Sequence, residues 1–137
     1  MKTLILTVGL PRSGKSTWSI KQGFPIVNAD SIRLALYNEA FIRDGENMVW
    51  TIAHYMVKSL FLAGHDVVIH DATNLTAGRR TPWLSGNWTT KYKLFKANEV
   101  TCIKRALESK KPELVEIIRI MADDIDYDVA PLWRKGK

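Results

Sequence analysis

The residues best suited to chemistry form a short segment near the N-terminus. Gly9 to Ser16 reads GLPRSGKS, which matches the pattern G-x-x-x-x-G-K-[ST], and Thr17 follows. Glycines let the backbone wrap round a phosphate with its N–H groups pointing inward, and a helix that begins at Gly14 adds partial positive charge. Lys15 would then contact the β- and γ-phosphates of a nucleotide, and the Ser16 hydroxyl would ligate Mg²⁺. The segment predicts a phosphate-binding loop for ATP and Mg²⁺.

The neighbouring elements help to decide between such a loop and a chance match in a glycine-rich turn. Lys2 to Val8 is a short apolar run rich in β-forming residues, and 14–22 reads as a helix. Strand, loop and helix in this order form the setting in which the pattern binds phosphate, so we favour the functional interpretation. The predicted nucleotide contacts are Gly9, Pro11, Arg12, Ser13, Gly14, Lys15, Ser16 and Thr17.

A carboxylate and a guanidinium follow the next predicted strand, residues 24–28. Asp30 and Arg33 are three residues apart, so they share one face at the start of a predicted helix that runs to about Asn38. Asp30 could accept a proton from an attacking hydroxyl, and Arg33 could bind a substrate phosphate. On spacing alone the alternative is commoner: Asp30 or Ser31 caps the helix, and Arg33 is exposed.

A third candidate follows the predicted strand 66–70, where residues 70–74 read HDATN. An Asp that closes a buried strand occupies the Walker B position, so Asp71 could hold the Mg²⁺ shell. The alternative is an Asx turn, which Asp71 and Asn74 would both suit. We expect His70 to be structural, and the sequence has no Cys/His cluster with metal-ligand spacing.

The order of the elements predicts the fold class. Further helices are predicted from about 44 to 64, weakly over 76–85, and at about 100–109 and 112–122, with a last strand at 91–95. Strands that alternate with helices imply right-handed crossovers and a parallel sheet. We therefore predict an α/β fold, a three-layer sandwich with a short central parallel sheet. It forms a single domain over residues 1–137, with a loose basic tail from about residue 130.

Composition and charge narrow the class of protein. The chain has 137 residues, of which 46% are hydrophobic and 25% charged, as in an ordinary globular domain with its own core. Its net charge of +6 favours polyanionic partners, but proteins that bind only ATP also carry such a charge. No apolar run could span a bilayer, and the N-terminus does not read as a signal peptide. With the single Cys102, this predicts a cytoplasmic protein without a membrane partner.

Four segments together carry a resemblance to a known family. They are GLPRSGKSTW at 9–18, NADSIR at 28–33, VVIHDATNLTAGRR at 67–80 and CIKRA at 102–106. In this order, from about Lys2 to Met121, the chain resembles the 5′-polynucleotide kinases, above all the kinase half of the phage end-healing kinase–phosphatase. The resemblance implies a P-loop NTPase-type sandwich with a helical lid. It also implies transfer of the γ-phosphate of ATP, with Mg²⁺, to the 5′-hydroxyl of DNA or RNA.

The resemblance further implies roles for individual residues. The catalytic residues would be Lys15, Asp30, Arg33 and Arg105. Among them Asp30 would be the general base, Arg33 would hold the adjacent 3′-phosphate of the acceptor, and Arg105 would be a lid contact. The acceptor would be bound by Asp30, Arg33, Asp71, Thr73 and Asn74, with Arg79 and Arg80 supporting that wall. The Mg²⁺ ligands would be Ser16 and Asp71.

The chain departs from the family pattern in three respects. No phosphatase domain follows, so we expect only the kinase activity. Arg12 stands where the family often has a small residue in the loop. One turn after Arg105, where the family's lid has a further Arg, the sequence reads Ser109-Lys110-Lys111. A Lys lacks the bidentate fork of Arg, so we expect lower turnover even where Lys110 or Lys111 substitutes.

Several aromatic and basic residues have two interpretations. Trp83 and Trp88 could stack on bases, as in single-strand binders, but ordinary packing is the favoured interpretation. A track for a strand backbone could be formed by several lysines, but ordinary surface coverage is the favoured interpretation. These are Lys91, Lys93, Lys96, Lys104 and Lys135.

The sequence thus predicts an ATP-dependent polynucleotide 5′-hydroxyl kinase whose partners are 5′-OH ends of DNA or RNA. One alternative is a P-loop kinase for a nucleoside, a nucleotide monophosphate or a sugar. Another is a non-catalytic ATP-binding partner of nucleic acid. The choice between DNA and RNA, and assembly into a homo-oligomer, stay open.

Overall fold

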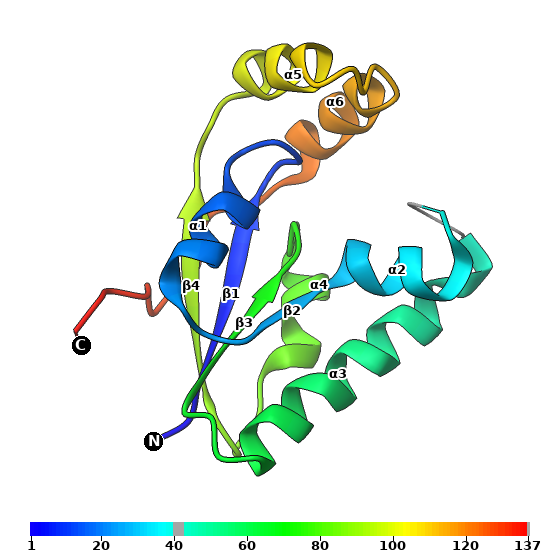
Figure 1. Ribbon diagram of the computed structural model, residues 1–137. Coiled ribbons are helices and arrows are strands. Elements are labelled where there is room, and N and C mark those ends of the chain that lie inside the picture. The colour runs from blue at the N-terminus through cyan, green and yellow to red at the C-terminus, as the bar shows by residue number, and fades with distance from the viewer. Residues whose placement is uncertain (40–42, 137) are drawn as a thin grey trace.

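The computed structural model describes residues 1–39 and 43–136, which form four strands and six α-helices (Figure 1). In chain order these elements are β1 (Thr3–Gly9), α1 (Lys15–Gln22), β2 (Ile26–Asn28), α2 (Ala29–Tyr37), α3 (Glu46–Leu62), β3 (Val67–Asp71), α4 (Ala77–Arg80), β4 (Thr89–Phe95), α5 (Glu99–Glu108) and α6 (Leu114–Asp124). Short 3₁₀ turns at 43–45 and 81–83 precede α3 and follow α4. None of the described helices is both long and apolar enough to cross a membrane.

The four strands form one parallel sheet in the order β2-β3-β1-β4. β1 lies at its centre, with Leu6 opposite His70 on one side and Tyr92 on the other. All strands point the same way, so their carboxyl ends meet at one edge, where ligands bind in open parallel sheets. The predicted α/β fold with a short parallel sheet is confirmed.

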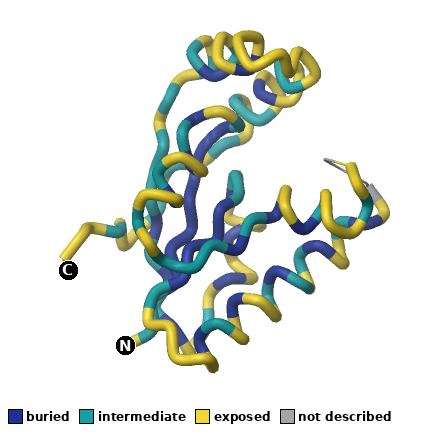
Figure 2. Tube along the Cα trace, viewed as in Figure 1, coloured by how far each residue is buried: buried dark blue, intermediate teal, exposed yellow. Residues whose placement is uncertain are grey.

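Helices cover both faces of this sheet. Leu4, Leu6 and Val8 alternate along β1 and point to one face, where they form the main core with α3 and two tryptophans. Ile5 and Ile69 are fully buried on the other face, and α1 packs against β1 and β3. Figure 2 shows the strands as the most buried part of the chain. Helices on both faces of the sheet give the predicted three-layer sandwich.

The α5–α6 pair stands beyond the carboxyl ends of the strands, above the loop that follows β1 (Figure 1). A second, smaller core joins it to that loop, made of Leu10, Cys102, Ala106 and Ile118. The pair occupies the position of the predicted helical lid. It therefore packs directly on the segment that we expect to bind phosphate.

Three local expectations need correction. The N-cap of α2 is Asn28, whose side chain accepts a hydrogen bond from Ser31 N at 2.8 Å, so neither Asp30 nor Ser31 has that role. The weak helix expected at 76–85 is only four residues long before Pro82 and a 3₁₀ turn. The start of the expected loose tail is anchored, because Leu132 forms a parallel bridge with Tyr92 of β4.

Candidate active site

The segment between β1 and α1 has the backbone geometry of a phosphate-binding loop. A Cβ at Gly9 would lie 2.8 Å from Phe95 Cβ and 2.6 Å from Ser13 Oγ, so no larger residue fits there. Gly14 has φ 103°, a conformation that favours glycine, and directly precedes α1. Arg12 adopts φ 66° without being a glycine, as strained residues at binding loops often do.

Lys15 lies inside this loop. Its Nζ donates hydrogen bonds to Gly9 O at 3.0 Å and Leu10 O at 2.6 Å, and the residue is buried. Burial lowers the pKa of Lys15 to about 8, against the opposing effect of the nearby carboxylates of Asp71 and Asp30. Because the Lys15 ammonium is buried and donates its hydrogen bonds to carbonyl groups, an anion beside it would stabilise its charge.

The Ser13 hydroxyl gives independent evidence that this loop binds a ligand. Its Oγ is buried and has no hydrogen-bond partner among the described residues. The hydroxyl belongs to the loop that would surround a nucleotide's phosphates, and a phosphate oxygen would satisfy it. The loop therefore fits the phosphates of ATP in shape, charge and hydrogen bonding.

Two oxygen atoms that could ligate a metal ion lie side by side, one at the start of α1 and the other at the end of β3. Ser16 Oγ donates to Asp71 Oδ2 at 2.8 Å, and Asn28 Nδ2 donates to the same oxygen at 3.0 Å. A hydroxyl and a carboxylate are the ligand types that Mg²⁺ takes from protein beside nucleotide phosphates. This pair fits the predicted metal position. Among the described residues there is no cluster of three or more His, Cys, Asp or Glu that could hold another metal ion.

Asp30 and Arg33 meet on the first turns of α2, as the spacing predicts. Arg33 NH1 donates to Asp30 Oδ1 at 2.7 Å. The same guanidinium also donates to Glu46, from Nε at 2.8 Å and from NH2 at 2.6 Å. Burial alone would lower the pKa of Arg33, but the hydrogen bonds and charges of Glu46 and Asp30 outweigh it and raise that pKa. The Arg33 side chain is only 12% exposed, whereas Asp30 is 75% exposed.

The loop after β3 is held by buried polar contacts. Asn74 Nδ2 donates to Thr7 O at 2.7 Å, and Asn74 itself has φ 45°. Arg80 NH1 donates to Asn74 O at 3.0 Å and to Asp126 O at 3.0 Å. Asn74 and Arg80 are both buried, so they support this loop from within. Thr73 is half-buried, and its carbonyl accepts the backbone N–H of Gly9.

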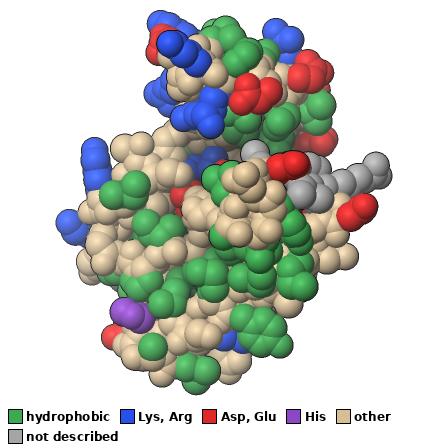
Figure 3. Space-filling view, turned by 45° about the vertical axis from the view of Figure 1, so that its right-hand side comes forward, with side chains coloured by type: hydrophobic (Ala, Val, Ile, Leu, Met, Phe, Trp, Pro, Cys, Tyr) green, Lys and Arg blue, Asp and Glu red, His purple; other side chains and the backbone are tan. Residues whose placement is uncertain are grey.

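Arg105 connects the lid to the phosphate loop. Its NH1 donates to Arg12 O at 3.1 Å, from the last turns of α5. Both arginines are exposed, so their charges lie at the open side of the loop. Figure 3 shows Lys and Arg side chains, interspersed with Asp and Glu side chains, at this end of the molecule. Lys110 and Lys111 are exposed at the turn between α5 and α6.

The two tryptophans that could have stacked on bases are core residues instead. Trp83 is 2% exposed and Trp88 is 8% exposed, and Trp88 Nε1 donates to Trp83 O at 2.9 Å. His70 packs on the Trp83 ring at 4.1 Å, and burial lowers the pKa of His70 to about 3. His70 is therefore neutral and structural, as expected.

The sequence alone did not single out three contributors. Asn28 orients Asp71, Glu46 holds Arg33, and the Trp50 ring lies 5.5 Å from the Arg33 guanidinium carbon. Asn28 stands inside the NADSIR segment, which could have indicated it. Glu46 and Trp50 begin a different helix, and only the packing of α2 on α3 brings them to Arg33.

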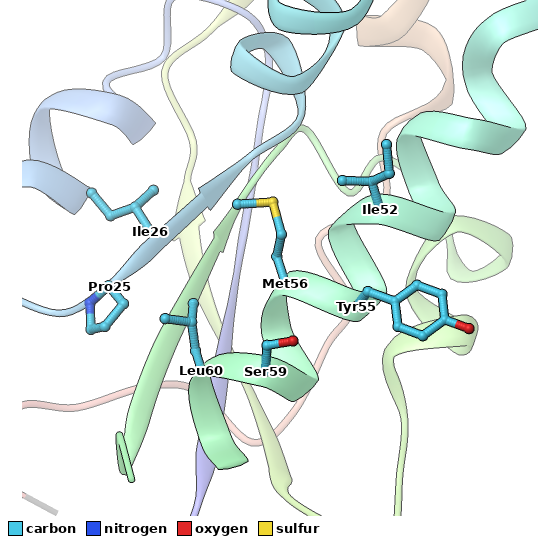
Figure 4. A pocket seen from close by; sticks show the side chains of 7 residues that line it. All are labelled: Pro25, Ile26, Ile52, Tyr55, Met56, Ser59 and Leu60. Atoms are coloured by element: carbon cyan, nitrogen blue, oxygen red, sulfur yellow. The ribbon is translucent and has the colours of Figure 1, made fainter. Parts of the chain in front are cut away.

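A groove of about 700 Å³ opens beside these residues. Its polar end is lined by Ser16, Asn28, Asp30, Ser31 and Asp71. Ile26, Ile52 and Met56 line its apolar end and also a second groove of about 440 Å³, which continues between β2 and α3 (Figure 4). The carboxylate and hydroxyl groups therefore face a space large enough for an acceptor.

Comparison with known proteins assigns the chain to a family. The family model described as AAA domain matches residues 4–113, which is most of the chain. The chain belongs to this AAA domain family. Its P-loop is the Gly9–Ser16 segment described above.

Solved structures share the fold of this chain. One chain of the Pnkp1/Rnl/Hen1 RNA repair complex matches with a TM-score of 0.69 and 18% identity, covering 98% of this chain and 50% of that one. A chain from another structure of the Pnkp1/Rnl/Hen1 complex matches with a TM-score of 0.65 and 24% identity, covering 76% and 38%. A gluconokinase from Sinorhizobium meliloti 1021 matches with a TM-score of 0.61 and 15% identity, covering 93% and 78%.

These likenesses define the fold. At under 25% identity they show a P-loop kinase fold, and the chain spans half or less of the two repair-complex chains. The predicted resemblance is thereby confirmed for the fold and the P-loop family. A kinase-like P-loop fold supports phosphotransferase activity. It implies ATP, and typically Mg²⁺, as cofactors.

Proposed function

We propose that this chain is an ATP-dependent polynucleotide 5′-hydroxyl kinase that transfers the γ-phosphate to the 5′-OH end of DNA or RNA. One arrangement carries the proposal: Asp30 and Arg33 lie together on α2, at the sheet edge that also holds the Ser16–Asp71 pair. A carboxylate that can accept a proton thus adjoins a guanidinium that can bind a phosphate. An acceptor that carries a hydroxyl next to a phosphate matches both.

The chain's own residues supply the parts of phosphoryl transfer. The loop backbone and Lys15 bind the ATP phosphates, and the Lys15 ammonium stabilises the negative charge that develops on the phosphate oxygens as the γ-phosphoryl group leaves ADP. Asp30 accepts the proton of the attacking 5′-hydroxyl, while Arg33 holds the acceptor's adjacent phosphate. Arg105 reaches over the loop from the lid, where it can stabilise charge on the phosphoryl group in transit. Positioning and electrostatics are the main contributions that this reaction requires from protein.

Ser16 and Asp71 would hold Mg²⁺, which would supply positive charge to offset the charge of the ATP phosphates. The oxygens of these two residues already lie 2.8 Å apart, and Asn28 fixes the orientation of the carboxylate.

Removal of the base tests the proposal. Asp30→Asn should retain ATP binding and lose transfer of labelled γ-phosphate to a 5′-OH oligonucleotide by about 10²-fold or more. Asp66→Asn is the matched control, because Asp66 is exposed in the turn before β3. An Asp30→Asn protein with full transfer activity would contradict the proposed mechanism.

A second candidate is a kinase for a small acceptor such as a sugar or a sugar acid. The match to a gluconokinase over 93% of this chain favours it, because the same fold accommodates that enzyme. The dependence of KM on salt concentration distinguishes the two candidate functions. A polynucleotide that displaces counterions binds more weakly as salt rises, so its KM should increase steeply, whereas the KM of a neutral sugar or of a singly charged sugar acid should change little.

A further inference from the structure

Two carboxylates bind Arg33, and their interactions with its guanidinium differ in strength. Glu46 binds it through two hydrogen bonds, at 2.8 and 2.6 Å, and the Glu46 side chain is 15% exposed. Asp30 binds it through one hydrogen bond at 2.7 Å and is 75% exposed. Paired, sheltered contacts to a guanidinium are stronger than a single contact in water. An anion that competes for Arg33 would therefore displace Asp30 and leave Glu46 in place.

The Trp50 ring lies beside the Arg33 guanidinium. Trp50 follows Glu46 by one helical turn, and its ring lies 5.5 Å from the Arg33 guanidinium carbon. The Trp50 ring in turn contacts the buried His70 ring, edge to face, at 5.9 Å. Arg33 is thus held from α3 by the Glu46 carboxylate and by the Trp50 ring, which packs against the core.

A phosphate at Arg33 would compete with the two carboxylates that this guanidinium already binds. The Arg33 guanidinium already pairs with two carboxylates, so a phosphate at Arg33 would be a third anion beside it, and the Arg79 guanidinium lies 5.7 Å from the same Trp50 ring. Repulsion between the phosphate and the exposed Asp30 carboxylate favours separation of the Asp30–Arg33 pair. The freed carboxylate would still line the groove that also holds Ser16 and Asp71.

We propose that Glu46 is a positioning residue for Arg33, and that a phosphate on the acceptor displaces Asp30 from Arg33, which frees the Asp30 carboxylate for the attacking hydroxyl. This rests on the proposed function, in which Asp30 is the base. Without an acceptor phosphate, Asp30 stays paired with Arg33 and accepts the hydroxyl proton poorly. The acceptor phosphate therefore raises the rate of transfer in addition to its contribution to binding.

Phosphite added in trans tests this coupling on the unaltered protein. With ATP and Mg²⁺ saturating, transfer to a nucleoside that has no phosphate should be stimulated by millimolar phosphite, about tenfold, as is usual for coupling between two ligands. Transfer to the matching nucleoside 3′-monophosphate should not be stimulated. Absence of stimulation on the nucleoside would overturn the proposal.

Glu46→Gln tests the positioning role. The ratio of kcat/KM for the nucleoside 3′-monophosphate to that for the nucleoside should fall about tenfold, and stimulation by phosphite should be lost. Glu116→Gln is the control, since Glu116 is exposed on α6 and pairs with Arg119 at 3.8 Å. Unchanged selectivity and unchanged stimulation in Glu46→Gln would refute the role of Glu46. If the unaltered protein phosphorylates neither an oligonucleotide nor a nucleoside 3′-monophosphate, the proposed function itself fails, which is a separate result.

Discussion

Lys15 should make the stability of the protein depend on pH in an unusual direction. Burial lowers its pKa from 10.5 to about 8 in the folded chain. Between these values the unfolded chain binds more protons, so the free energy of unfolding rises with pH. The cost of the charged Lys15 is fully present below pH 8 and disappears as pH passes 10.5. A shift of this size corresponds to about 3 kcal/mol in all, of which roughly 2.5 kcal/mol falls between pH 7 and 10.

Urea unfolding of the wild type and Lys15→Met at pH 7 and pH 10 measures this contribution. Other groups titrate equally in both proteins, so the difference in unfolding free energy should move by about 2.5 kcal/mol in favour of the wild type. Lys21→Met is the control, because Lys21 is exposed at the end of α1. ATP should diminish the effect, because its phosphates stabilise the charged lysine. A difference that stays constant, or that moves against the wild type, would refute the assignment of a buried, desolvated Lys15.

Three other substitutions test separate parts of the account. Arg80→Met removes buried hydrogen bonds to the loop after β3 and to Asp126, so it should cost about 3 kcal/mol and lower Tm by roughly 10 °C in a thermal melt. Gly9→Ala places a Cβ 2.8 Å from Phe95 Cβ, so calorimetry should show ATP binding weakened by about 1 to 3 kcal/mol. Arg105→Lys keeps the charge but loses the fork, so kcat should fall at least tenfold with little change in the KM for ATP. An unaltered Tm, ATP affinity or kcat, respectively, would contradict each expectation.

Most of the fold follows from local patterns in the sequence. Apolar runs that stop at Gly9 and Asp71 predict buried parallel strands, and the period of the apolar residues in 46–62 predicts α3. The phosphate loop is recognisable because its chemistry requires glycines and a lysine at fixed spacing. The Asp30–Arg33 contact also follows from helical spacing, since both residues lie on one face of one helix.

The contacts that sequence patterns could not predict depend on packing between elements that are far apart in the sequence. Glu46 reaches Arg33 only because α3 packs on α2, and no local pattern marks that contact. For Trp83 and Trp88 the sequence favoured packing over stacking on bases, and the core between α3 and the sheet confirms this. Segment 131–133 joins the edge of β4 through backbone hydrogen bonds, and the pattern of side chains in the sequence does not predict such bonds.

The central claim is tested most directly by offering labelled [γ-³²P]ATP and Mg²⁺ in parallel to a 5′-OH oligonucleotide, a nucleoside and gluconate. The account predicts label on the 5′ end of the oligonucleotide, with a KM that rises with salt, and loss of that label in Asp30→Asn. Label on gluconate or the free nucleoside alone would keep the P-loop kinase fold and contradict the polynucleotide acceptor.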